Sequence, residues 1–281
     1  MTRPAMTRPR PDSPSTIHPP RPMKPLVLAL LVALAAPAAA QSDAAAVVER
    51  GRALVTAGYF ANSADTLLAA RATLGVAAQA ADPEVAAWAA YYAALADYRL
   101  ASVFWGSDPE RAVAHAEGGA AALAPVVERA GLPDALRAEA YALHAALLSA
   151  QMGIDPARAG RLGPAAQAST RASLRLAPDN PRVLFQSASS LLTTPPEWGG
   201  DPAEGARELE RAATLFGEPA GPLAPMWGED EAWAWLGLAH LMAGDAAAAR
   251  PAIERAEALH PASPFVQYKL KPWLAQVEPA R

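Results

Sequence analysis

The residues that most often carry chemistry are few in this sequence and are not spaced for catalysis. The chain has no Cys, which excludes disulfides, thiolate metal sites and cysteine nucleophiles. Four of its five His lie beyond residue 40, and none forms a His-x-x-x-His pair. Neither a G-x-x-x-x-G-K-[ST] phosphate loop nor a G-x-S-x-G nucleophile turn occurs. We therefore expect no enzyme activity, no catalytic residue, no bound metal and no cofactor.

The remaining ionisable clusters have structural explanations. His260 lies in the last turn of a predicted helix, where a cation interacts favourably with the helix dipole. Three consecutive acids, residues 229–231, open another predicted helix, where negative charge is favourable for the same reason. An enzyme of unrecognised type would need several ionisable groups converging in one cleft, and the sequence offers no such set.

Two tryptophans stand out because they lie in predicted loops and not in helices. Trp198 is followed by two glycines and Trp227 by one. Trp is enriched among the residues that contribute most to protein interfaces, so both side chains are candidate anchors for a partner. The alternative is that each loop folds back and buries its own ring.

The first 40 residues do not fit the pattern of the rest. Residues 1–22 are rich in Pro and Arg and show no helical or strand period. Met23-Lys24-Pro25 is followed by an apolar run over residues 26–36 and by Ala38-Ala39-Ala40, which has the form of a signal peptide. We predict a signal peptide over 23–40, cleavage near Ala40/Gln41 and a periplasmic or secreted bacterial protein of residues 41–281. The alternative is an uncut N-terminal anchor helix.

The charge of the predicted mature chain argues against two classes of partner. Without residues 1–40, the chain has 19 Lys and Arg against 27 Asp and Glu, a net charge of −8. A nucleic-acid-binding protein would carry a basic surface, and an anionic membrane would repel this chain. We expect no nucleic acid and no membrane span after signal cleavage; the oligomeric state is not specified by the sequence.

The mature region has the composition of a helical protein. Good helix formers dominate it, and a short polar residue followed by Pro, as in Asp82-Pro83 and Asn180-Pro181, recurs at predicted helix starts. The polar side chain can cap free N–H groups, and Pro at the first helical position loses no hydrogen bond. The predicted helices span 44–57, 61–79, 83–102, 109–130, 134–152, 163–176, 181–193, 201–216, 229–243, 246–259 and 263–276.

These helices form pairs, and one pair has the spacing of a repeat. Residues 230–261 carry an aromatic, a Leu-Gly step, small residues on the second helix and a closing Pro: Trp233, Leu236-Gly237, Ala249, Ile253, Ala256 and Pro261. This unit resembles the 34-residue tetratricopeptide repeat. It departs from the pattern at His240, where Tyr is usual, and at Pro251, which puts the start of the second helix in doubt.

The resemblance extends more weakly over residues 44–276. A second unit begins at Pro181 and carries an extra loop over residues 195–199. The order of motifs along the chain is similar to that of bacterial exported tetratricopeptide proteins of undefined role. The resemblance implies an all-α, right-handed α-solenoid of about five antiparallel helix pairs with a C-terminal capping helix.

The concave surface of such a solenoid is lined by residues of the first helix in each pair, and a groove of this kind suits an extended or helical peptide. The leading hypothesis is therefore a scaffold that binds a protein or peptide partner. The alternative is a small-ligand-binding accessory component of a solute transporter, which a closed ring with a buried polar cluster would favour. The predicted partner-binding residues are Arg182, Phe185, Ser189, Leu192, Trp198, Trp227, Glu231, Leu238, Leu241 and Met242.

Overall fold

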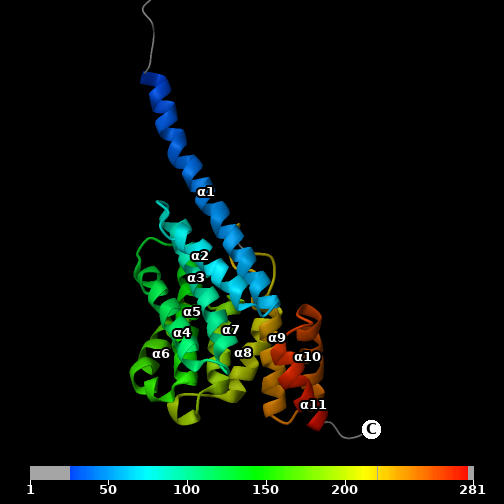
Figure 1. Ribbon diagram of the computed structural model, residues 1–281. Coiled ribbons are helices and arrows are strands. Elements are labelled where there is room, and N and C mark those ends of the chain that lie inside the picture. Colours follow the sequence, from blue (N-terminus) through cyan, green and yellow to red (C-terminus); the bar gives the residue numbers. More distant parts are fainter. Residues whose placement is uncertain (1–25, 220, 278–281) are drawn as a thin grey trace, which may run out of the picture. The chain divides into compact units, whose positions relative to one another are not determined.

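The computed structural model describes residues 26–219 and 221–277, and this part of the chain is all-α (Figure 1). Residues up to Ala39 and those from Ala40 onward form two units, and only the second is described further. Segment 1–22 and the start of the predicted signal peptide lie outside the described residues, so the signal peptide stays a prediction. No helix in the described ranges is long and apolar enough to cross a membrane.

Eleven α-helices follow one another in the described ranges, and most lie close to the predicted spans. The first begins at Leu26 and not near residue 44, and the predicted helix 263–276 is divided into Val266–Leu270 and Lys271–Val277. Three short turns of other helix types accompany them: Pro156–Arg158, Pro196–Trp198 and Val266–Leu270. The α-helices are α1 (Leu26–Phe60), α2 (Ala64–Ala77), α3 (Pro83–Phe104), α4 (Pro109–Glu128), α5 (Asp134–Ile154), α6 (Ala159–Leu176), α7 (Pro181–Thr193), α8 (Pro202–Leu215), α9 (Glu229–Met242), α10 (Ala246–Leu259) and α11 (Lys271–Val277).

Local capping explains where several of these helices begin. The carboxylate of Asp82 accepts hydrogen bonds from two backbone N–H groups at the start of α3, and the Asn180 amide oxygen does the same for α7. The Asp201 carboxylate caps α8 by accepting one hydrogen bond, from the backbone N–H of Glu204 at 2.9 Å. The predicted polar-Pro helix starts are therefore confirmed at these positions. Pro251 does not delay its helix, because α10 already begins at Ala246.

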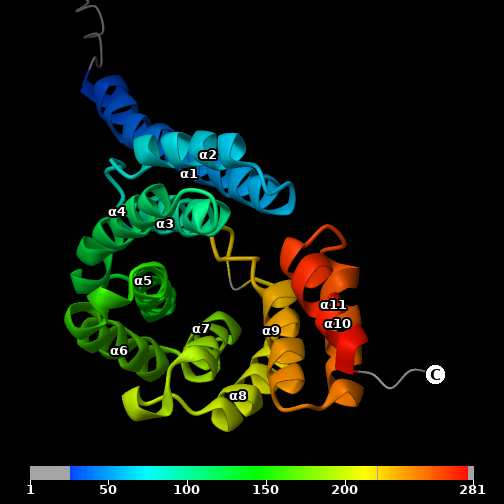
Figure 2. The ribbon, with the colours of Figure 1, turned by 60° about the horizontal axis from the view of Figure 1, so that its bottom comes forward.

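Adjacent helices pack as pairs: α3 with α4, α5 with α6, α7 with α8, and α9 with α10. The first helices of successive pairs also touch, from α3 to α5, α7 and α9 (Figure 2). The buried apolar side chains separate into two main core clusters. One extends from Val48 to Ala166, and the other extends from Leu184 to Leu274.

The crossing of α9 and α10 requires a glycine. A Cβ built on Gly237 would lie 2.6 Å from Cγ1 of Ile253, which is 1% exposed. Gly237→Ala should therefore lower the free energy of unfolding by about 1–3 kcal/mol, because the buried Ile253 has little room to move. Urea denaturation followed by circular dichroism measures this.

Gly75 provides the matched control for that substitution. It also lies inside a helix, α2, and a Cβ there would meet no atom within 4 Å. Gly75→Ala should raise stability by about 0.5–1 kcal/mol, through helix propensity alone. Equal effects of the two substitutions would contradict close packing at Gly237.

Candidate functional site

The two ends of the row of helix pairs meet, within residues 40–277. The hydroxyl of Tyr59, at the end of α1, donates to Asp230 Oδ2 of α9 at 2.6 Å. The neighbouring Phe60 ring lies 4.4 Å from the ring of His260, which follows α10. We call this contact region, with Arg99 and Glu231, the junction. The two ends of the row of pairs are therefore in contact with each other (Figure 2).

A buried ion pair lies at the centre of the junction. The Arg99 guanidinium of α3 donates to both carboxylate oxygens of Glu231, at 2.6 and 2.5 Å. The two side chains are only 5% and 13% exposed. Arg99 also lies 4.1 Å from the centre of the Tyr59 ring and 5.0 Å from that of Trp227. Burial raises the pKa of Glu231, although the charge of Arg99 opposes the shift.

Asp230 behaves differently from its neighbour Glu231. Burial by itself would raise its pKa, but hydrogen bonds from His260 and Tyr59 and the charge of Arg99 hold the pKa below its ordinary value. An ionised carboxylate only accepts hydrogen bonds, so His260 Nδ1, 3.2 Å from Asp230 Oδ2, must carry a proton. In the neutral ring, Nε2 is then left with a lone pair.

The lowered pKa of Asp230 gives a testable pH dependence. A carboxyl group with a lowered folded-state pKa contributes stability above its unfolded-state pKa, and this contribution disappears as pH falls through the folded-state value. Asp230→Asn should lower the free energy of unfolding by about 2 kcal/mol at pH 7. The difference from wild type should shrink below about pH 4.

Urea denaturation of both proteins between pH 3 and pH 8 tests this. The other charged and titratable groups that face Asp230 (Tyr59, Arg99, Glu231 and His260) are present in both proteins, so the difference reports the loss of the Asp230 charge together with its interactions with them. A difference that stays constant down to pH 3 would contradict the role of the Asp230 charge.

A cavity of about 300 Å³ opens beside this cluster, between the end of α1, α3, α9 and the segment after α10. Trp235 and Phe265, with ring centres 5.9 Å apart, form part of its wall. Burial raises the pKa of Tyr98 in the same wall to about 12, so its hydroxyl keeps its proton. The titratable wall residues are Tyr59, Tyr98, Arg99, Asp230, Glu231 and His260. We call this space the junction cavity.

Two residues that line the cavity each have a buried side-chain nitrogen without a hydrogen-bond partner: Arg99 Nε and His260 Nε2. Leaving a buried polar atom unsatisfied costs about 1–3 kcal/mol. Such atoms are rare in proteins, and each needs an explanation. A ligand that supplies the missing partners is one such explanation.

Residues 221–228 run back across the inner side of the helices, and we call them the return segment. Arg52 Nη1 donates to the carbonyl oxygens of Pro222 and Ala224, at 2.8 and 3.1 Å. The Tyr92 hydroxyl donates to the Leu223 carbonyl at 2.8 Å. Side chains of α1 and α3 thus satisfy carbonyl groups of an irregular, partly buried segment.

A second buried polar network ties the return segment to α5 and α7. Glu139, 2% exposed, accepts from Tyr91, Asn180 and Arg182 at 3.1, 2.7 and 2.7 Å. The indole N–H of Trp227 donates to the Tyr91 hydroxyl at 2.9 Å. Trp227 therefore folds back onto its own chain, the second of the two possibilities that the sequence left open.

The residues predicted to line a concave binding surface occupy different environments. The four apolar ones, expected to be accessible, are instead 1–6% exposed, because the inner helices and the return segment cover them: Phe185, Leu192, Leu238 and Leu241. Arg182 and Glu231 are engaged in the buried ion pairs with Glu139 and Arg99. Ser189 is half-buried. Met242 and Trp198 are 47% and 59% exposed.

Sequence reasoning missed Tyr59, Arg99 and Trp235, and it assigned His260 only to a helix end. One signal was available, because Arg99 lies within the otherwise mainly apolar run of α3. A charged residue inside such a run is rarely buried without a partner. Its partner, Glu231, lies 132 residues away and could not be identified from spacing.

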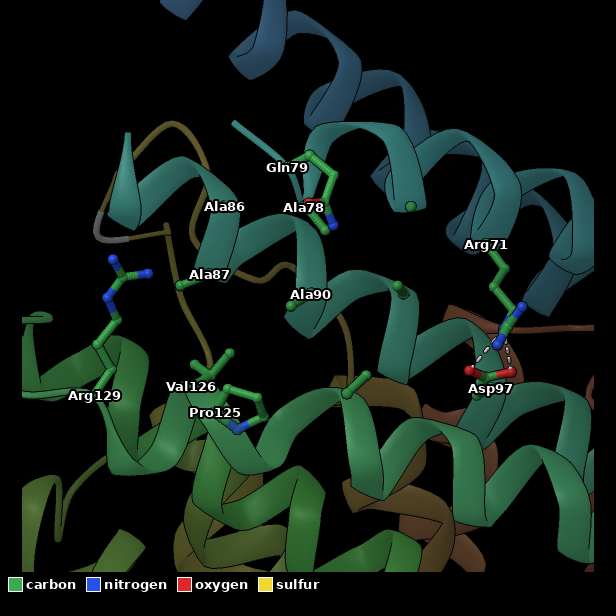
Figure 3. Close-up of a pocket in the computed structure, with 13 residues that line it drawn as sticks. Arg71, Ala78, Gln79, Ala86, Ala87, Ala90, Asp97, Pro125, Val126 and Arg129 are labelled. Carbon is green, nitrogen blue, oxygen red and sulfur yellow. Dashed lines mark hydrogen bonds and ion pairs between the residues drawn. The ribbon is translucent and has the colours of Figure 1, made fainter. Parts of the chain in front are cut away.

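A second concave region, which we call the alanine groove, lies between α2, α3 and α4 and has a volume of about 440 Å³. Figure 3 shows Ala86 and Ala90 of α3 between an ion pair at one end and Arg129 at the other. The ion pair joins Arg71 to Asp97 at 2.8 Å. Asp97 is 2% exposed and also contacts the imidazole of His115 at 2.8 Å. The groove is thus apolar along its length and carries Arg at both ends.

The fold and the junction define a class: an all-helical protein of packed helix pairs with a polar-walled cavity where the ends of the row meet. No family model and no curated protein matches the sequence. One similar solved structure is the HusA haemophore from Porphyromonas gingivalis, with a TM-score of 0.56 and 25% sequence identity. The similarity covers 68% of this chain and 91% of that one.

Proposed function

We propose that the chain is an exported, tetratricopeptide-like right-handed solenoid that binds a small, largely apolar ligand in the junction cavity and catalyses no reaction. One observation carries this proposal: the cavity wall combines aromatic side chains with two buried nitrogen atoms that lack a partner. Small-molecule sites are typically apolar spaces of about 300–1,000 Å³ with a few fixed polar groups. The closed junction favours this function over the peptide scaffold.

The similar solved structure suggests which ligands to test first. It is a haemophore, a haem-carrying protein, so we propose a tetrapyrrole as the ligand class. A tetrapyrrole is planar and largely apolar with acidic side groups, and the cavity wall offers aromatic rings and a guanidinium group. The predicted signal peptide supports a periplasmic or secreted location, where a ligand carrier would act.

Titration of residues 41–281 with haemin and with metal-free protoporphyrin tests the proposal. Binding in the junction cavity should quench the fluorescence of Trp235 saturably, with one ligand per chain. Trp235→Phe should weaken the binding, because it replaces one of the aromatic rings of the cavity wall with a smaller one. Trp198→Phe is the matched control, because Trp198 does not line the cavity; this variant should keep both the quenching and the affinity. If neither compound gives a saturable signal, the ligand class is rejected.

A scaffold for a protein or peptide partner is the second candidate function, and the alanine groove supports it. Its apolar length and the Arg residues at its ends suit an acidic helical segment. Ala90→Arg would block the groove and should abolish capture of such a partner from a periplasmic extract. By contrast, Phe185→Asp and Leu238→Asp would place a charge in the core and should unfold the protein, so they are poor tests of partner binding.

A further inference from the structure

We propose that Nε2 of His260 coordinates the metal of a metalloporphyrin, such as the iron of haem, held in the junction cavity. This inference rests on the proposed ligand-binding function. His260 is 2% exposed, it lines the cavity, and its Nε2 has no hydrogen-bond partner. A buried imidazole nitrogen that makes no hydrogen bond is the kind of group that a metal centre can bind.

The hydrogen bonds around His260 prepare it for this role. Asp230 accepts the Nδ1 proton, and the Tyr59 hydroxyl donates to the same carboxylate oxygen. A histidine that binds a metal almost always donates its other N–H to a carboxylate, a carbonyl or water, which fixes the ring and raises its basicity. Asp230 and Tyr59 therefore act as positioning residues.

His260 does not belong to a cluster of metal-binding side chains in the described part of the chain, and this indicates what kind of metal-containing ligand fits. A bare metal ion needs three or four protein ligands, and within the described ranges no group of three or more His, Asp or Glu is placed to hold one. A metal already enclosed by a macrocycle needs only one or two axial ligands from the protein. A single prepared imidazole beside Trp235 and Phe265 therefore fits a metalloporphyrin.

Two neighbouring side chains complete the arrangement. Arg99 keeps one buried N–H without a partner, and it can bind a carboxylate side group of the macrocycle. The Phe60 ring lies over the imidazole at 4.4 Å but is 43% exposed. Because Nε2 is buried, neighbouring side chains must move before a metal reaches it.

The test compares haemin with metal-free protoporphyrin, using residues 41–281 of wild type, His260→Ala and His260→Gln. The readouts are the position of the Soret band, the iron spin state by electron paramagnetic resonance and the dissociation constant. Wild type should give a histidine-ligated spectrum. Both variants should lose it and bind haemin at least about 10-fold more weakly. Their affinity for metal-free protoporphyrin should be unchanged.

Two controls separate ligation from folding. Free imidazole should restore the spectrum of His260→Ala, which a merely misfolded variant would not allow. His240→Ala removes a histidine that does not line the cavity and should leave the spectrum unchanged.

The outcomes distinguish this inference from the function on which it rests. A spectrum retained in both His260 variants, or equal wild-type affinity for the two porphyrins, overturns ligation by His260 but keeps porphyrin binding. Loss of the spectrum in His240→Ala also overturns it. Failure of wild type to bind either porphyrin rejects the proposed ligand class itself.

Discussion

Replacing Glu231 with alanine is expected to lower the free energy of unfolding by about 3–5 kcal/mol. The substitution leaves the Arg99 guanidinium, 5% exposed, without its carboxylate. Removing one partner of a buried ion pair lowers the free energy of unfolding by far more than the whole pair contributes to it, because the remaining charge is neither solvated nor compensated. Urea denaturation at pH 7, followed by circular dichroism, measures the loss.

Two further variants isolate the cause. In the double variant Arg99→Met/Glu231→Leu no charge remains, and most of the stability should return, because well-packed apolar residues often replace a buried pair without loss. Glu254→Ala removes a carboxylate that is 63% exposed and paired with Arg250, and its effect should stay within about 0.5 kcal/mol. A Glu231→Ala protein as stable as Glu254→Ala would show that the junction does not hold the row of helix pairs closed.

Replacing Trp227 with alanine is the second substitution with a large expected effect, a loss of about 3–5 kcal/mol. The indole packs against both main core clusters. It also donates to Tyr91 and has the edge of its ring toward Phe185, with ring centres 6.5 Å apart. Since this side chain links the two clusters, the variant should also unfold in two steps, the clusters melting separately.

Calorimetry together with urea denaturation checks both parts of this prediction. Trp198→Ala provides the matched control, because Trp198 also lies before a glycine in a loop but is 59% exposed. Its effect should stay within about 0.5 kcal/mol. Trp227→Ala could instead unfold in a single cooperative transition and lose less than 1 kcal/mol of its free energy of unfolding. This result would show that the return segment contributes little to the connection between the clusters.

The first of these effects concerns a contact that forms the proposed binding site, and Trp227 lies next to it, with its ring centre 5.0 Å from the Arg99 guanidinium. The junction is closed largely by an ion pair and by hydrogen bonds to Asp230. A ligand that binds at the junction should stabilise the folded protein. Once the ligand concentration exceeds the dissociation constant, the free energy of unfolding should rise with the logarithm of that concentration.

The sequence by itself determined the helices and the way in which neighbours pair. Both depend on interactions between residues close in the chain. Asp82 and Asn180 cap the helices that start beside them, and Gly237 is small because Ile253, sixteen positions later, crosses there. Such signals repeat locally, so composition, polar-Pro helix starts and one near-complete repeat were enough to predict an all-α protein of packed helix pairs.

Only the tertiary structure decided that the row of pairs closes. Small rotations between successive pairs add up over the whole chain, and no local motif encodes their sum. The contact of Tyr59 with Asp230 spans 171 residues, and that of Arg99 with Glu231 spans 132. The same closure buried Phe185 and Leu238, which the sequence predicted on an open surface. It also placed His260, a helix-end residue by its sequence position, at the wall of the cavity.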